Sequence, residues 1–284
     1  MKRLFWMLYV VQIALVLVLS DAIAAGISVD AGLTPAEDRW ILRTQLRYME
    51  RDDDPTSMNR KMDRYTLNIV LAYGLRRNLT LVLKQPVVHQ EMSMAGSTSK
   101  DTGLANLSLL AKYGIYRRNT PEHTFGGAMT FGLELPTGAD AFTSETWDVN
   151  PGLYMSWRRG SWASDFNIAY AWNGLADESS RGTNPGDELS LDWALAHQFS
   201  IGGEAEVALA PVLEVSYKNI GQDRLYSHDV ADTGETILYI SPGLKFTKSS
   251  LILEALAQIP VWQEQEGSQL KRSTGGFVGI RFMF

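Results

Sequence analysis

Several residue types and patterns are missing from this sequence of 284 residues. It contains no cysteine, which excludes disulfides, thiolate metal sites and a cysteine nucleophile. After residue 25 no run approaches the roughly 20 apolar residues of a membrane-spanning helix, so helical membrane proteins are excluded. The net charge of −6 and the lack of a basic stripe argue against a nucleic-acid partner. We expect no metal and no cofactor, because none of the histidines has ligand-like spacing: His89, His123, His197 and His228.

Residues 1–24 have the order of a secretory signal peptide. Two basic residues precede a long apolar run, and Ala22 and Ala24 fit the small-x-small pattern of a cleavage site. We expect cleavage after Ala24; an uncleaved membrane anchor is the alternative, since the run is near spanning length. Residues 25–38 would then form a short periplasmic lead-in, too short for an energy-coupled plug domain.

The rest of the chain, residues 39–284, consists of segments of about ten residues in which apolar side chains occupy every second position. In the first segment Trp40, Leu42 and Leu46 alternate with Arg43 and Gln45. Side chains two positions apart share one face of a β-strand. Twelve such segments follow one another, and an even number of strands is typical of a bacterial outer-membrane barrel.

Charge and loop length distinguish this pattern from that of a soluble β-sandwich. None of the outward positions is charged, although charged residues make up 20% of the chain. Short links such as "RRGS" (158–161) alternate with long ones such as "NGLADESSRGTNPGD" (173–187). Outer-membrane barrels have short periplasmic turns and long extracellular loops. The sequence therefore predicts an all-β transmembrane antiparallel barrel of about 12 strands, in the outer membrane of a Gram-negative bacterium.

The last strand and the aromatic residues indicate partners of such a barrel. Val278, Ile280, Phe282 and Phe284 resemble the C-terminal signature of outer-membrane proteins, which implies recognition by the barrel-assembly machinery. We expect Phe284 to face lipid at the periplasmic rim. Other outward aromatic residues at strand ends would form interfacial girdles against outer-membrane lipid and lipopolysaccharide: Tyr48, Tyr65, Tyr73, Tyr113, Trp157, Trp162, Trp172 and Phe246.

Three stretches in the first half of the chain carry a family resemblance. They are "AYGLRRNLTLVLKQPVV" (72–88), "TGLANLSLLAKYGIY" (102–116) and "FGLELPTG" (131–138). In this order they resemble the outer-membrane β-barrel family of meta-pathway phenol-degradation or transporter proteins. The resemblance implies a barrel that passes small, often aromatic or apolar, molecules across the outer membrane.

Charged residues fall on the inward positions of the predicted strands. Strands 1 to 4 point bases inward: Arg43, Arg47, Arg64, Lys84 and Lys112. Strands 5 to 9 point acids inward: Glu134, Asp148, Asp165, Glu188, Asp192, Glu206 and Glu214. Lys245, Glu254 and Arg281 mix the signs where the barrel closes.

Two interpretations of these opposed walls stay open. The walls could create a transverse field across a wet pore, or the same charges could pair inside a plugged lumen. If the pore is open, the excess of inward acids predicts a modest preference for cations. We expect Arg43, Arg47, Asp165 and Asp192 to matter most, because they lie near mid-strand.

We predict a passive channel or transporter for uptake or efflux of small molecules, with the solute left open. A closed structural or adhesion barrel is one alternative, and a lipid-modifying enzyme is another. Ser164 and His197 lie on outward positions, but we expect no catalytic pair and no enzymatic activity. The acidic first loop could offer oxygen ligands to Ca²⁺; a solvated loop is the favoured interpretation for Asp52, Asp53, Asp54 and Asp63.

Overall fold

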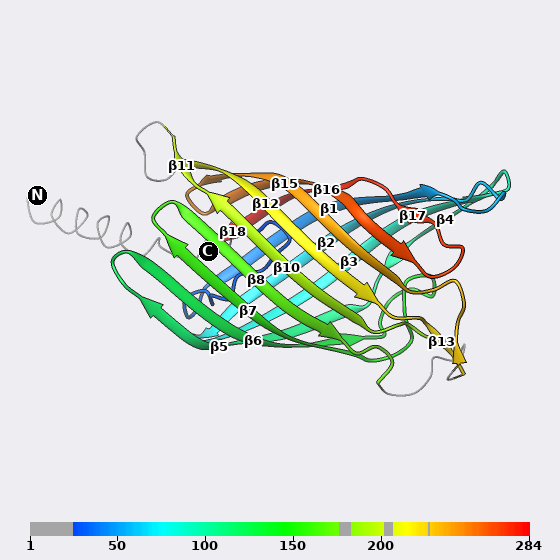
Figure 1. The fold of residues 1–284 in the computed structure, drawn as a ribbon. Helices are drawn as coiled ribbons and strands as arrows, with labels where there is room; N and C mark the ends of the chain where they lie inside the picture. Colours follow the sequence, from blue (N-terminus) through cyan, green and yellow to red (C-terminus); the bar gives the residue numbers. More distant parts are fainter. Residues whose placement is uncertain (1–24, 176–182, 202–206, 227) are drawn as a thin grey trace, which may run out of the picture.

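Alternating apolar and polar side chains place the chain in twelve long strands that close into a barrel (Figure 1). The computed structural model describes residues 25–175, 183–201, 207–226 and 228–284. Among these residues no helix is long and apolar enough to span a membrane. The barrel strands are β1 (Trp40–Asp53), β2 (Lys61–Arg76), β3 (Leu79–Met94), β5 (Leu107–Asn119), β6 (His123–Leu135), β7 (Asp148–Arg159), β8 (Trp162–Ala171), β10 (Glu188–His197), β12 (Val207–Ile220), β15 (Glu235–Lys248), β16 (Leu251–Gln265) and β18 (Gly275–Met283).

Each barrel strand pairs antiparallel with its neighbours around the ring. β10 pairs with β12, and β1 pairs with β18, so the ring has no unpaired edge. A closed ring satisfies the backbone groups that lipid could not. This confirms the predicted antiparallel barrel of twelve strands.

Six short strands extend or decorate the barrel. β4 (Ser97–Leu104) pairs with the outer part of β3, β11 (Phe199–Ser200) with β12, and β17 (Lys271–Arg272) with β1. β9 (Thr183–Asn184), β13 (Arg224–Leu225) and β14 (His228–Asp229) form a small separate sheet.

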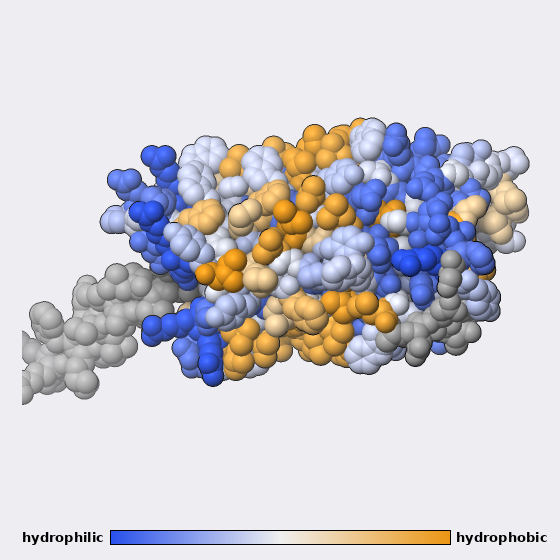
Figure 2. All heavy atoms as spheres, turned by 60° about the horizontal axis from the view of Figure 1, so that its bottom comes forward, coloured by the Kyte–Doolittle hydropathy of each residue, from blue (hydrophilic) through white to orange (hydrophobic). Residues whose placement is uncertain are grey.

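The strand register places the predicted apolar face outward. Leu46 lies opposite Leu67 on one side and Val278 on the other, so three apolar outward residues stand in a row. Leu46 is 43% exposed, whereas its inward neighbour Gln45 is only 2% exposed. On the face shown in Figure 2, hydrophobic side chains gather between two hydrophilic ends. This surface suits a hydrocarbon layer between two aqueous ones.

The predicted alternation of short turns and long loops is confirmed. Tight turns join β2 to β3, β7 to β8 and β15 to β16, and they lie at one end of the barrel, with the C-terminus (Figure 1). At this periplasmic end the backbone N–H of Trp40 donates to the carbonyl of Phe284 at 2.8 Å, which completes the seam. Phe284 is 51% exposed at the rim, as predicted. Aromatic rings meet at two levels along β1: Trp40 packs on Tyr73 at its start, and Tyr48 packs on Tyr65 farther along the strand.

The segment before the first strand lies in a different place from the one expected. Residues 25–34, which we call the lumen segment, run inside the barrel instead of forming a periplasmic lead-in. Ala25 and Ile27 are fully buried, and Leu33 is 5% exposed. Burial of these apolar side chains and pairing of their backbone with inward polar groups favour the interior over water. The predicted signal peptide, residues 1–24, lies outside the described residues.

Candidate functional site

Two inward carboxylates hold the lumen segment by its backbone. Asp165 on β8 accepts hydrogen bonds from the N–H of Ala25 at 2.5 Å and of Gly26 at 3.4 Å. Glu214 on β12 accepts from the N–H of Ile27 at 2.5 Å and of Ser28 at 2.9 Å, and also from the Ser28 hydroxyl. Because the lumen segment belongs to no strand or helix, its N–H groups have no ladder partners, and these carboxylates take the place of such partners.

Basic side chains bind the carbonyl groups of the same segment. Lys245 on β15 donates its Nζ to the carbonyl of Ala25 at 2.6 Å, and Lys112 on β5 donates to that of Ala31 at 2.5 Å. The N–H of Gly32 donates to the hydroxyl of Ser156 on β7 at 2.7 Å. Gln45 on β1 also donates to the carbonyl of Ile27, at 3.5 Å, so five strands besides β12 hold the lumen segment.

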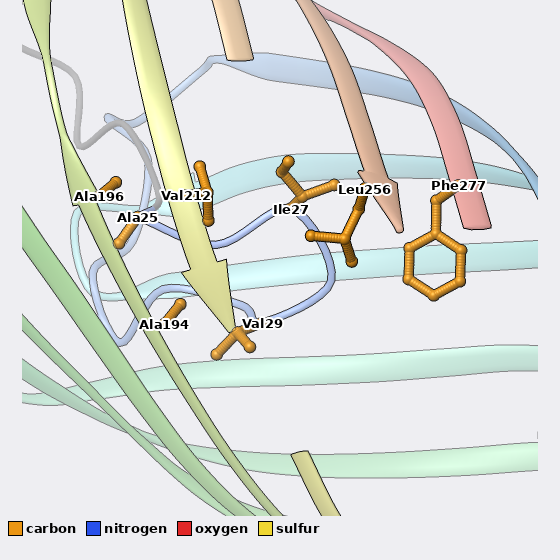
Figure 3. Close-up of a cluster of buried hydrophobic side chains, with 8 residues drawn as sticks. All are labelled: Ala25, Ile27, Val29, Ala194, Ala196, Val212, Leu256 and Phe277. Carbon is orange, nitrogen blue, oxygen red and sulfur yellow. The ribbon is translucent and has the colours of Figure 1, made fainter. Parts of the chain in front are cut away.

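Apolar packing fixes the side of the lumen on which the segment lies (Figure 3). Ile27 and Val29 belong to one buried cluster with side chains of β10, β12, β16 and β18, several of them small: Ala194, Ala196, Val212, Leu256 and Phe277. Gly32 approaches the wall so closely that an added Cβ would lie 2.4 Å from the Tyr154 carbonyl oxygen. The barrel wall and the lumen segment are therefore complementary in shape.

A third inward acid is neutralised by bases of adjacent strands. Glu254 on β16 receives Arg43 Nε at 2.8 Å and Arg281 Nη2 at 3.2 Å, and its side chain is fully buried. Gln45 also donates to Glu254, at 3.3 Å. Asp30 of the lumen segment lies 3.9 Å from Arg43. These pairs match the paired-charge interpretation for this part of the barrel.

The lumen segment leaves two open compartments along the opposite wall. One, of about 780 Å³, lies toward the periplasmic end and is lined by β1, β2, β3, β5 and the lumen segment. The other, of about 870 Å³, lies toward the extracellular loops; β1, β2, β3 and the rim supply most of its lining, and β12, β15, β16 and β18 supply single residues. Arg47, Asn68 and Lys84 line both compartments, so these three side chains lie between the two.

Bases dominate the lining of both compartments among the described residues. The periplasmic compartment has six basic residues and two acids; the acids are Asp30 and Glu134. The extracellular one has seven basic residues and a single acid, Asp232. Some of these bases have acidic partners behind the lining, as in the pairs of Glu235 with Arg51 and Arg272. The open space therefore follows the basic wall, while the lumen segment covers much of the acidic one.

The remaining predicted lumen residues occupy inward positions with local partners. Arg64 donates to Gln90 from Nε at 2.8 Å, and Glu134 accepts from Ser108 at 3.3 Å. Asp148 accepts from Thr146, Asp192 accepts from Ser216, and Glu188 accepts from Lys218. Asp165 also binds Arg158, at 2.7 Å. Glu206 lies outside the described residues. The structure thus brings the predicted charges into the lumen, but not as two facing open walls.

Sequence reasoning missed the lumen segment. Its signal was present, because Ile27, Val29, Ala31 and Leu33 alternate with Ser28 and other polar or small residues in the manner of a strand. These odd-numbered residues are all buried, whereas Asp30 is exposed to the lumen. The segment follows the predicted signal peptide, where a polar lead-in was the simpler interpretation. The sequence also did not single out Asn68, an uncharged residue that lines both compartments.

The other candidate sites have ordinary partners. Ser164 accepts a hydrogen bond from the Trp193 indole at 3.0 Å, and His197 packs between Trp162 and Phe199. In the first loop Arg60 binds Asp54 at 2.7 Å and lowers its pKa well below the usual aspartate range. Among the residues that the structure describes, no cluster of three or more histidines and carboxylates could hold a metal ion.

Comparison with known proteins agrees with this architecture. The chain matches the family model described as "Putative MetA-pathway of phenol degradation" over residues 38–266. It is similar to the COG4313 outer membrane channel from Pseudomonas putida F1, with 16% identity and a TM-score of 0.69 over 91% of this chain and 100% of that one. The β-domain of the Bordetella autotransporter Brka is 8% identical, with a TM-score of 0.51 over 87% of this chain and 100% of that one. At these identities the likeness shows the shared fold. No curated protein matches the chain in sequence.

Proposed function

Because the chain belongs to the family of the MetA pathway of phenol degradation, we propose that it forms a passive outer-membrane channel for small molecules. The observation that carries this proposal is the pair of lumen compartments, one toward each end of the barrel, that share Arg47, Asn68 and Lys84 in their linings. The similarity of the fold to an outer membrane channel supports the same role. In this proposal solutes move down their own gradients.

We also propose that export removes residues 1–24. The backbone nitrogen of Ala25 is buried and lies 2.5 Å from Asp165 Oδ2. A free amino group at Ala25 would be protonated at neutral pH and would form an ion pair with this carboxylate. Mass measurement of the exported protein should give a chain that begins at Ala25. A mature chain that retains residues before Ala25 would contradict this assignment.

Conductance measurements distinguish an open channel from a closed structural barrel. We expect the purified protein to give discrete conductance steps in a planar bilayer and to let small solutes swell liposomes. A panel of sugars, amino acids and aromatic acids would identify the preferred solute class. Heat-denatured protein is the control. A folded barrel without conductance and without swelling for any of these solutes would refute the proposal.

The same preparation tests the enzymatic alternative. The structure gives Ser164 a tryptophan donor and His197 aromatic neighbours, and neither contact orients a nucleophile. We therefore expect no phospholipid hydrolysis by the folded barrel. Hydrolysis above the level of the Ser164→Ala and His197→Ala variants would reassign the protein to a different class.

A further inference from the structure

Most inward acids of the barrel wall are shielded from the open compartments; among the described residues the acids that line them are Asp30, Glu134 and Asp232. Asp165 and Glu214 point at the backbone of the lumen segment, and each is 1% exposed. Glu254 lies between two arginines and is also buried. A charge that is paired and covered by protein contributes little to the potential that a passing solute experiences.

The bases on the opposite wall are not compensated in this way. Lys84 is exposed to the lumen and makes no direct hydrogen bond or ion pair among the described residues, while Glu134 and Asp30 of the same compartment act on it only at longer range. Arg47 donates to the neutral Gln45, and Arg64 donates to the neutral Gln90. Lys112 binds carbonyl groups of the lumen segment and lies over the Tyr154 ring, and none of these partners is a carboxylate. A line of net positive charge therefore runs along β1, β2, β3 and β5.

Apolar side chains accompany this line of charge on the same strands. Val70 and Val82 line the periplasmic compartment, and Val88 lines the extracellular one together with Phe277 of the neighbouring β18. On β3 the inward positions follow one another as Val82, Lys84, Pro86 and Val88. A solute that follows this wall meets a positive charge flanked by apolar surface.

We propose, on the basis of the channel function above, that the pathway selects small organic anions with an apolar body, such as carboxylates and sulfonates. The apolar body would lie against the valines, and the anionic group would pass from Arg64 to Lys84 and Lys112. This selectivity is opposite in sign to the modest cation preference that the inward acids predict from sequence. The reason is that the lumen segment and the arginine pairs cover those acids.

Confined water strengthens each remaining charge. At a separation of about 8 Å and ordinary ionic strength, one unit charge changes the ratio of anion to cation permeability about two- to fivefold. Removal of Lys84 should therefore lower that ratio by this factor, and removal of Arg47 should do the same. A lysine outside the lumen should have no such effect.

Reversal potentials under a salt gradient in a planar bilayer test the proposal. Benzenesulfonate and benzyltrimethylammonium are suitable probes, because both are permanently charged and have similar apolar bodies; methanesulfonate tests the need for that body. We expect benzenesulfonate to be the most permeant of the three. Lys84→Gln and Arg47→Gln should each lower the anion-to-cation ratio. Lys100→Gln is the matched control, because Lys100 pairs with Glu91 on the external hairpin.

Each outcome has a defined consequence. Anion selectivity that falls in both lumen variants and stays constant in Lys100→Gln supports the proposal. A conducting channel that prefers benzyltrimethylammonium, or whose selectivity does not change in the lumen variants, overturns it and leaves the channel function intact. A folded barrel that never conducts refutes the channel function itself, and the selectivity proposal falls with it.

Discussion

Replacement of Glu214 by glutamine should loosen the lumen segment without unfolding the barrel. Glu214 accepts three hydrogen bonds from Ile27 and Ser28, and its side chain is 1% exposed. Hydrogen bonds to a charged group contribute about 1.5 to 3 kcal/mol each, against about 0.5 to 1.5 kcal/mol for neutral ones. Loss of the charge should therefore weaken the binding of the lumen segment to the barrel wall by about 2 to 4 kcal/mol. The fraction of molecules in which the lumen segment has left the wall would rise roughly 30- to 1000-fold.

The absence of native cysteine makes this change measurable with a single thiol. Val29 is 3% exposed and packs in the buried cluster, so Val29→Cys should react with a maleimide only when the segment leaves the wall. We expect Glu214→Gln to raise the labelling rate at least tenfold and to add a higher conductance level in single-channel recordings.

A matched control separates this effect from a general change of charge. Glu264 is exposed at the extracellular end of β16, and Glu264→Gln should leave labelling and conductance unchanged. Heat-modifiable mobility on a gel checks that each variant is folded. If Glu214→Gln is folded and labels at the parent rate, the carboxylate does not hold the segment, and our account of the acidic wall is incorrect.

Three further changes test other contacts. Gly32→Ala should also raise labelling of the thiol probe, because its methyl group would lie 2.4 Å from the Tyr154 carbonyl oxygen; an unchanged rate would refute the close fit. Glu235→Gln should destabilise the rim by about 3 kcal/mol, since two guanidiniums lose their carboxylate, and should lower the temperature at which compact gel migration is lost; an unchanged temperature would refute this. Because Arg60 lowers the pKa of Asp54, the loop contacts should persist as the pH falls below the ordinary aspartate pKa and be lost only near the lowered value. Pepsin at about pH 3 should therefore cut residues 54–60 faster in Asp54→Asn than in the parent, and equal rates would contradict this.

The barrel could be predicted from the sequence because its physical cause is local. Each strand needs an apolar face toward lipid, and that need repeats every second residue from Trp40 to Phe284. The inward position of Arg47 or Lys84 followed directly from this period. Strand number, register and loop alternation therefore required no knowledge of distant contacts.

The partners of the inward charges could not be predicted in the same way. The two-residue period places Asp165 and Glu214 on the inward face of the barrel, but it does not show which residues they contact there. The space before them is filled by residues 140 and 187 positions away in the sequence, Ala25 and Ile27, whose side chains carry no charge. When an acid binds backbone N–H groups, no oppositely charged side chain in the sequence identifies its partner.

The long sequence separation of these contacts has a consequence for the order of assembly. The lumen segment directly precedes β1, the strand whose pairing with β18 closes the ring. Its partners on β8, β12 and β15 stand together only after most of the wall has formed. Contacts between residues so far apart in the sequence form late, because the entropy cost of closing the long intervening chain must first be overcome. The lumen segment is thus among the last parts of the chain to reach its final partners. Its docking would take place only in a barrel whose wall is complete.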